Sequence, residues 1–148
     1  AVPWETLLLL GGGFAMAVGI QESGLSGWLA GRLAAAQSLP AFGQILVASV
    51  AAVTLSAFAS NTATVAILLV VLKDAVGAGA LLPALAAATF AASCDFALPV
   101  GTPPNAIVFG SGYVRIPVMA RYGVLLDLLA ALVAAAWCAF AVPLVLGG

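Results

Sequence analysis

Three consecutive short polar residues, Ser60-Asn61-Thr62, interrupt an otherwise apolar stretch over residues 44–74. Their hydroxyl and amide groups offer hydrogen-bond donors together with oxygen acceptors. In a bilayer, one straight helix over this stretch would be about 45 Å long, too long for a hydrocarbon core of ~30 Å without strong tilt. Two half-helices that meet at the triplet would each be too short to cross. The pattern therefore predicts a re-entrant helical hairpin over residues 44–74, with Thr62 opening its second half.

A second irregular motif, PVGTPPN, runs from Pro99 to Asn105 and follows an apolar run. Three prolines and a glycine in seven residues prevent a helix from continuing. Apolar character resumes at Ala106 and lasts until the glycines at 110 and 112. The motif therefore predicts one helix over residues 81–112 that ends at Leu98 and resumes after the break.

Non-helical backbone at membrane depth is tolerated where it lines a cavity or binds a ligand. Freed carbonyls suit an alkali cation, and amides at the start of a half-helix suit a carboxylate, which the helix dipole also favours. Two interrupted segments of this kind are typical of the binding site of a secondary transporter. The alternative for the triplet is that its small polar side chains only hold helices together.

The overall composition places these segments in a membrane. Of the 148 residues, 65% are hydrophobic and 6% are charged, which is too few to cover a water-facing surface. Long apolar runs without alternation of period two favour helices over a barrel. The net charge of −1 gives no basic patch for nucleic acid, and the chain has no histidine for a catalytic triad. With no nucleophile–base pair in evidence, an enzyme is not expected.

The predicted fold is an all-α integral membrane protein whose main partner is the lipid bilayer. We expect a multi-pass protein of the cell membrane, which would be the inner membrane in a bacterium. Residues 1–148 are predicted to form a single membrane unit. Its expected parts are a membrane span at 1–21, an interfacial helix at 25–37, the re-entrant hairpin at 44–74, the broken helix at 81–112 and a last span at 117–146.

Three segments carry a family resemblance: WETLLLLGGG from Trp4, SAFASNTATVAILL from Ser56, and LPVGTPPNAIVFGSG from Leu98. Together they resemble the divalent anion:sodium symporter family, whose members carry dicarboxylates, citrate or sulfate with sodium. The resemblance covers essentially the whole chain. It implies two inverted repeats, each with a hairpin and a broken helix, that move in an elevator-like manner. This chain matches the C-terminal repeat without its first two helices.

The resemblance also implies site residues, partners and a coupling ion. A sodium ion would be bound, mainly by backbone carbonyls, at four positions: Ser56, Ala59, Asn61 and Gly101. The small divalent anion (succinate, malate, citrate or sulfate) would be contacted by Ser60, Asn61, Thr62, Thr102 and Pro103. The missing N-terminal repeat or another copy of the chain would supply the other half of the site, and the complete protein would be a homodimer.

Two carboxylates, Asp95 and Asp127, lie within apolar segments. An ionisable group inside a membrane is a candidate for function. Asp95 lies about one turn before the predicted break, so it would tune the sodium site or take a proton. The alternative for both residues is a carboxylate near the interface or one bonded to a neighbouring helix.

Other functions remain open from the sequence. One is a related carrier that takes another anion with proton coupling. A second, of a different class, is a truncated half that associates with another subunit as a membrane interaction module. A third is an antiparallel pair of copies that rebuilds the symmetric site.

Overall fold

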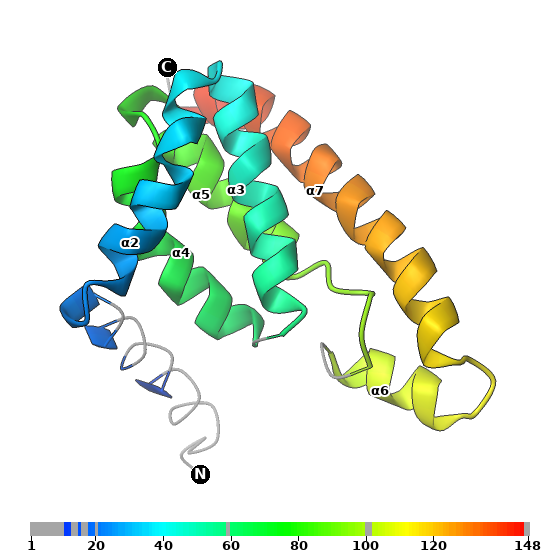
Figure 1. Cartoon of the computed structure of the whole chain (residues 1–148). Coiled ribbons are helices and arrows are strands. Elements are labelled where there is room, and N and C mark those ends of the chain that lie inside the picture. Colours follow the sequence, from blue (N-terminus) through cyan, green and yellow to red (C-terminus); the bar gives the residue numbers. More distant parts are fainter. Residues whose placement is uncertain are drawn as a thin grey trace, which may run out of the picture.

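The computed structural model describes residues 11, 12, 15, 18, 19, 21–58, 60–99 and 102–146. Within these residues all regular secondary structure is helical (Figure 1). The elements from residue 25 onward are α2 (Leu25–Leu33), the 3-10 helix η1 (Ala34–Ser38), α3 (Ala41–Ser56), α4 (Asn61–Ala75), α5 (Ala78–Ala92), α6 (Pro103–Gly110) and α7 (Ile116–Leu146). The all-α class is thus confirmed for this part of the chain, and most of the span predicted at 1–21 lies outside it.

Three helices, α3, α5 and α7, form the packed centre of the structure, and each contacts the other two (Figure 1). Their contact surfaces are rich in small side chains. The fully buried alanines of these three helices are Ala48 and Ala52 of α3, Ala84, Ala87, Ala91 and Ala92 of α5, and Ala131 and Ala135 of α7. Such residues let helix backbones approach closely, which is typical of helix packing in lipid.

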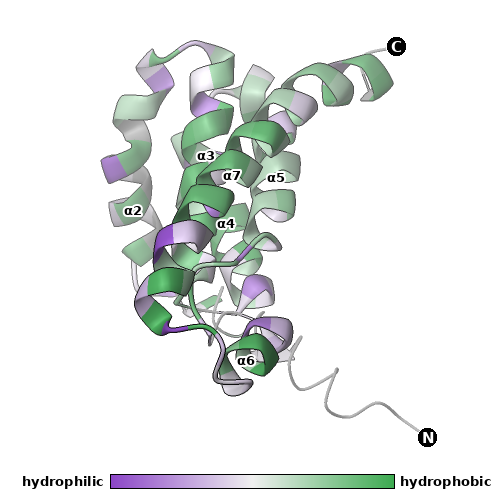
Figure 2. Ribbon diagram, turned by 90° about the vertical axis from the view of Figure 1, so that its right-hand side faces the viewer, coloured by the Kyte–Doolittle hydropathy of each residue, from purple (hydrophilic) through white to green (hydrophobic). Residues whose placement is uncertain are grey.

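The outward faces of the helices are apolar as well. Along α7, Leu125, Val133 and Trp137 are each more than half exposed. Figure 2 shows hydrophobic colouring along most of α7 and only a few hydrophilic residues. A monomer in water rarely exposes so large an apolar surface, so lipid or other apolar protein segments must surround these helices.

The last helix is the longest of the described elements. Its segment Ile116–Val145 has 30 residues and is the one described stretch both long and apolar enough to cross a membrane. Its bounds lie close to residues 117–146, where the last span was predicted, and that this helix crosses a membrane stays a prediction. The apolar helices α3 and α5 have 16 and 15 residues, fewer than the ~20 that a straight span needs.

The predicted hairpin corresponds to α3 and α4, with the chain interrupted at residues 57–60 (Figure 1). Helix α4 begins at Asn61, before the predicted start at Thr62, because the Ser60 hydroxyl caps it by accepting a hydrogen bond from the Ala63 N–H at 3.2 Å. The helix expected at 25–37 is present as α2 and η1, and α2 packs on α4. Placement of either segment relative to a membrane stays a prediction.

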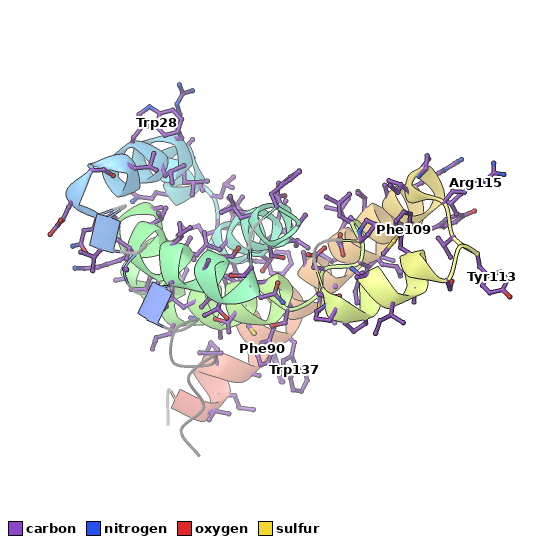
Figure 3. All side chains as sticks on the ribbon, turned by 90° about the horizontal axis from the view of Figure 1, so that it is seen from below. Trp28, Phe90, Phe109, Tyr113, Arg115 and Trp137 are labelled. Carbon is purple, nitrogen blue, oxygen red and sulfur yellow. The ribbon has the colours of Figure 1, made fainter. Side chains whose placement is uncertain are left out.

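The predicted broken helix corresponds to α5 and α6, separated by an irregular segment from Ser93 to Thr102. The first half ends at Ala92 and not at Leu98, so the prolines do not set its end. Helix α6 projects from the bundle and packs extensively on none of the other described helices. Figure 3 shows Phe109 of α6, with Tyr113 and Arg115 just after it, at the opposite edge from Trp28.

Candidate functional site

The hairpin tip joins two helix ends of opposite polarity. Ser56 is the last residue of α3 and is fully buried, while Ser60 caps α4. Asn61 and Thr62 form the first turn of α4 and are half-buried. The end of α3 presents carbonyls without helical partners, and the start of α4 presents free N–H groups. One end therefore favours a cation and the other an anion. Ala59, expected between them, lies outside the described residues.

Three oxygen atoms at this tip are buried and accept no hydrogen bond within the described part of the chain: Ser56 Oγ, Asn61 Oδ1 and Thr64 Oγ1. A buried oxygen without a donor is unfavourable by about 1–3 kcal/mol. Hard cations take oxygen ligands. These oxygens therefore fit the binding of an alkali cation at the tip.

Other hydroxyls in the helix bundle do find partners in their own helix. Ser49 of α3 donates to the Ile45 carbonyl at 3.0 Å, and Thr89 of α5 donates to the Leu85 carbonyl at 2.8 Å. Ser49 is as fully buried as Ser56. The free oxygens at the tip are thus a local feature and not a general property of hydroxyls in this bundle.

Thr64 is a residue that the motif-based prediction missed. It is fully buried and lies three positions after Asn61, on the same face of α4. That spacing was present in the sequence as NTAT and is the signal that would have identified it.

The irregular segment before α6 is held by side chains from two other elements. The Asn105 amide donates to the carbonyls of Asp95 and Leu98 at 2.8 and 3.0 Å. The Phe96 N–H donates to Asp127 Oδ1 at 2.8 Å. These bonds replace those that a continued helix would make, which explains why α5 ends at Ala92. Asp127 therefore bonds to the segment that follows α5. This resembles the alternative in which its carboxylate is bonded to a neighbouring helix.

Thr102 caps α6 by accepting a hydrogen bond from the Asn105 N–H at 3.4 Å. The next two residues, Pro103 and Pro104, have no N–H groups. The Thr102 hydroxyl, which accepts in this bond, can still donate a hydrogen bond to an anion. Gly101, the other residue expected here, lies outside the described residues.

The hairpin and the break share one cavity of about 300 Å³. Its lining includes Phe58 next to the tip, Ala97 and Leu98 of the irregular segment, and Asp127 of α7. Thr102 and Pro103 instead line a separate open hollow together with Pro99, Ala106 and Phe109. The structure thus brings the end of α3 to residues 97–98. Ser60, Asn61 and Thr62 line neither of these two hollows, so they do not share one with Thr102 and Pro103.

Asp95 is buried, with 2% of its surface exposed, and neither carboxylate oxygen accepts a hydrogen bond within the described residues. The Ala97 N–H interacts with this carboxylate and with that of Asp127, outside hydrogen-bond geometry. Asp95 therefore differs from Asp127, whose Oδ1 accepts a direct hydrogen bond from the Phe96 N–H.

Comparison with known proteins identifies the family of this chain. Residues 1–146 match the family described as the sodium:sulfate symporter transmembrane region. The chain belongs to the sodium:sulfate symporter family. This confirms the resemblance inferred from the motifs, and it places the chain among membrane transporters and not among enzymes.

Individual members of the sodium:sulfate symporter family are closely similar to this chain. It is 42% identical over 125 residues to Na(+)/dicarboxylate cotransporter 3 of Rattus norvegicus, covering 83% of this chain and 21% of that protein. It is 44% identical over 125 residues to the sodium-dependent dicarboxylate transporter SdcS of Staphylococcus saprophyticus, covering 82% of this chain and 24% of that protein. The chain thus spans between a fifth and a quarter of the length of these relatives.

Proposed function

We propose that this chain supplies one hairpin and one sodium site of a secondary transporter that carries divalent anions with sodium. Succinate, malate, citrate and sulfate are the proposed substrates. The observation that carries the proposal is the set of buried, unbonded oxygens at the hairpin tip, between a helix end that favours cations and one that favours anions. Membership of the family and the names of the relatives support it.

In the proposed sodium site, backbone carbonyls at Ser56, Ala59, Asn61 and Gly101 surround the ion. The Ser56 and Asn61 side-chain oxygens, together with Thr64 Oγ1, lie unbonded at the same tip. Carbonyls that converge on one point repel each other until a cation lies between them. Sodium therefore binds first and orders the tip.

The anion then binds to neutral groups of Ser60, Asn61, Thr62, Thr102 and Pro103. Neither motif contains Lys or Arg, so sodium supplies the positive charge. The first N–H groups of α4 face the anion, with the helix dipole favouring negative charge. Binding without a permanent cationic side chain allows the carrier to release its cargo after the elevator-like motion.

The proposed architecture places residues 44–74 as a re-entrant hairpin and residues 81–112 as a broken helix in a multi-pass protein of the cell membrane. The inverted N-terminal repeat, or another copy of this chain, completes the site from the opposite side. The complete protein is proposed to be a homodimer. The length of the relatives, several times that of this chain, supports a larger transport unit.

Uptake measurements test the proposed function directly. The complete carrier in proteoliposomes is expected to accumulate radiolabelled succinate, citrate or sulfate only when external sodium is present. Sodium is replaced by choline at equal ionic strength as the control. Equal uptake in choline would contradict sodium coupling, whereas proton-driven uptake in choline would favour the related proton-coupled carrier.

Replacing Thr64 with valine tests the cation site separately. Valine keeps the shape of the side chain and removes the unbonded hydroxyl, so the fold should keep its stability. We expect the sodium concentration for half-maximal uptake to rise by about tenfold or more, since a lost contact to a charged group is worth about 1.5–3 kcal/mol. The matched control is Thr89→Val, whose hydroxyl bonds within its own helix. Equal sodium dependence in both variants would remove Thr64 from the site.

Asp95 is proposed to tune the sodium site through its buried, unbonded carboxylate. The variant Asp95→Asn keeps the size and removes the negative charge. A nearby negative charge favours cation binding, so we expect weaker sodium binding in the variant, measured by isothermal titration at several pH values. Sodium affinity unchanged across pH would exclude this role.

A further inference from the structure

The irregular segment between α5 and α6 meets the backbone of α7 directly at Gly123. A Cβ built on Gly123 would lie 2.4 Å from the Phe96 carbonyl oxygen and 2.5 Å from the Ala97 Cα. Backbone atoms cannot move aside as a flexible side chain can. Other helical glycines differ, because a Cβ on Gly79 or Gly110 would meet nothing within 4 Å. The close approach at Gly123 therefore depends on the absence of a side chain.

Asp127 contacts the same segment one helical turn later. Its Oδ1 accepts the hydrogen bond from the Phe96 N–H at 2.8 Å, and the side chain is buried. Residues four apart lie on one face of a helix. Gly123 and Asp127 therefore form a two-point contact that fixes both the distance and the register of residues 96–97 against α7.

This contact bears on the candidate site through the short chain that follows it. Leu98 lines the cavity next to the hairpin tip, and its carbonyl is held by Asn105 in the first turn of α6. Asp127 lines the same cavity. A shift of residues 96–97 away from α7 would therefore displace the segment that leads to Gly101 and Thr102.

We propose that Gly123 and Asp127 are positioning residues, which hold the interruption of the α5–α6 helix in the place that sodium and anion binding require. The proposal rests on the proposed transport function. Asp127 acts by accepting a hydrogen bond. Gly123 acts because it has no side chain, so the backbone of residues 96–97 can pack directly against α7. Neither residue contacts the ion or the anion itself.

The test uses the complete carrier in proteoliposomes and four variants. Asp127→Leu removes the acceptor, Asp127→Asn keeps an oxygen that accepts from the Phe96 N–H, and Gly123→Ala inserts a Cβ. Gly79→Ala is the matched control for the glycine change. For each folded variant, the sodium and succinate concentrations for half-maximal uptake are measured separately from the maximal rate.

We expect Asp127→Leu and Gly123→Ala to raise the half-maximal sodium concentration at least tenfold. Asp127→Asn should stay within about threefold of the parent and so rescue the loss, and Gly79→Ala should match the parent. Parental values in folded Asp127→Leu and Gly123→Ala would overturn the proposal. A loss in Asp127→Asn as large as in Asp127→Leu would also overturn it, because charge and not hydrogen bonding would then be decisive.

Folding failures leave the test intact. If Asp127→Leu does not fold, Asp127→Ser replaces it, since a serine hydroxyl is too short to reach Phe96, and parental sodium dependence there would overturn the proposal. The same experiment distinguishes a failure of the proposed transport function from a failure of the proposed positioning role. A parent protein without sodium-dependent uptake counts against the proposed function, whereas a sodium-dependent parent with unaffected variants counts against the positioning role alone.

Discussion

Replacing Asn61 with alanine is expected to abolish measurable sodium-dependent uptake by the complete carrier. Asn61 is the one residue proposed for both the sodium and the anion site, and its Oδ1 is buried without a partner. Losing one contact to a cation and one to an anion, each about 1.5–3 kcal/mol, reduces uptake by roughly a hundredfold or more. Initial uptake rates at sodium and succinate concentrations near the parental half-maximal values, normalised to folded protein, measure the loss.

A second substitution at the same position separates the two roles. Asn61→Asp keeps an oxygen for the cation but adds a negative charge that repels the anion. We therefore expect sodium binding to persist in this variant while succinate uptake is lost. Ser49→Ala, at a buried hydroxyl on α3 that bonds its own helix, serves as the control and should transport normally. Full uptake by Asn61→Ala would show that the tip is only a structural joint.

The two interruptions of helical structure were predictable because their causes are local. A polar triplet with a good capping residue ends one helix and begins another, and clustered prolines prevent a helix from continuing. Both interruptions are present, at residues 57–60 and between α5 and α6. The apolar composition likewise sufficed for the all-α class, because helices and closed barrels satisfy the backbone in lipid and the long apolar runs lack the period-two alternation of a barrel.

The end of α5 was mispredicted because its cause is not local. Ala92 is followed by five residues before Leu98, and none of them is a proline or glycine that would end a helix. The Phe96 N–H finds its partner in Asp127, 31 positions later, and Asn105 binds the carbonyls of Asp95 and Leu98. A prediction from neighbouring residues cannot include partners that only the packing of α7 brings near.

In the candidate site, too, some residues were predictable from the local motif and others only from the packing of the helices. Ser56 and Asn61, expected from the motif, carry unbonded oxygens at the tip, whereas Thr64 emerged only once its burial was known. Thr102 and Pro103 line a hollow of their own, because α6 projects from the bundle. Helix packing decides which side chains face the same binding space. The spacing of residues within one motif is not enough to predict this.

Replacing Asn105 with alanine should destabilise the irregular segment between α5 and α6. The carbonyls of Asp95 and Leu98 would then be left without the donor that now satisfies them at 2.8 and 3.0 Å. Each unsatisfied buried carbonyl is unfavourable by about 1–3 kcal/mol, so we expect the free energy of unfolding to fall by about 2–6 kcal/mol. Denaturant unfolding of the purified carrier in bicelles measures the change.

Two further variants assign this loss to the amide donor. Asn105→Asp has nearly the same size but places oxygens where the amide donates, so it should be at least as unstable as the alanine variant. Ser111→Ala removes an exposed hydroxyl that donates to the Val108 carbonyl, and its effect should stay within about 0.5 kcal/mol. Parental stability in both Asn105 variants would mean that Asn105 does not maintain the break. Helix α7 would then be the element that holds residues 96–97 in place through Asp127.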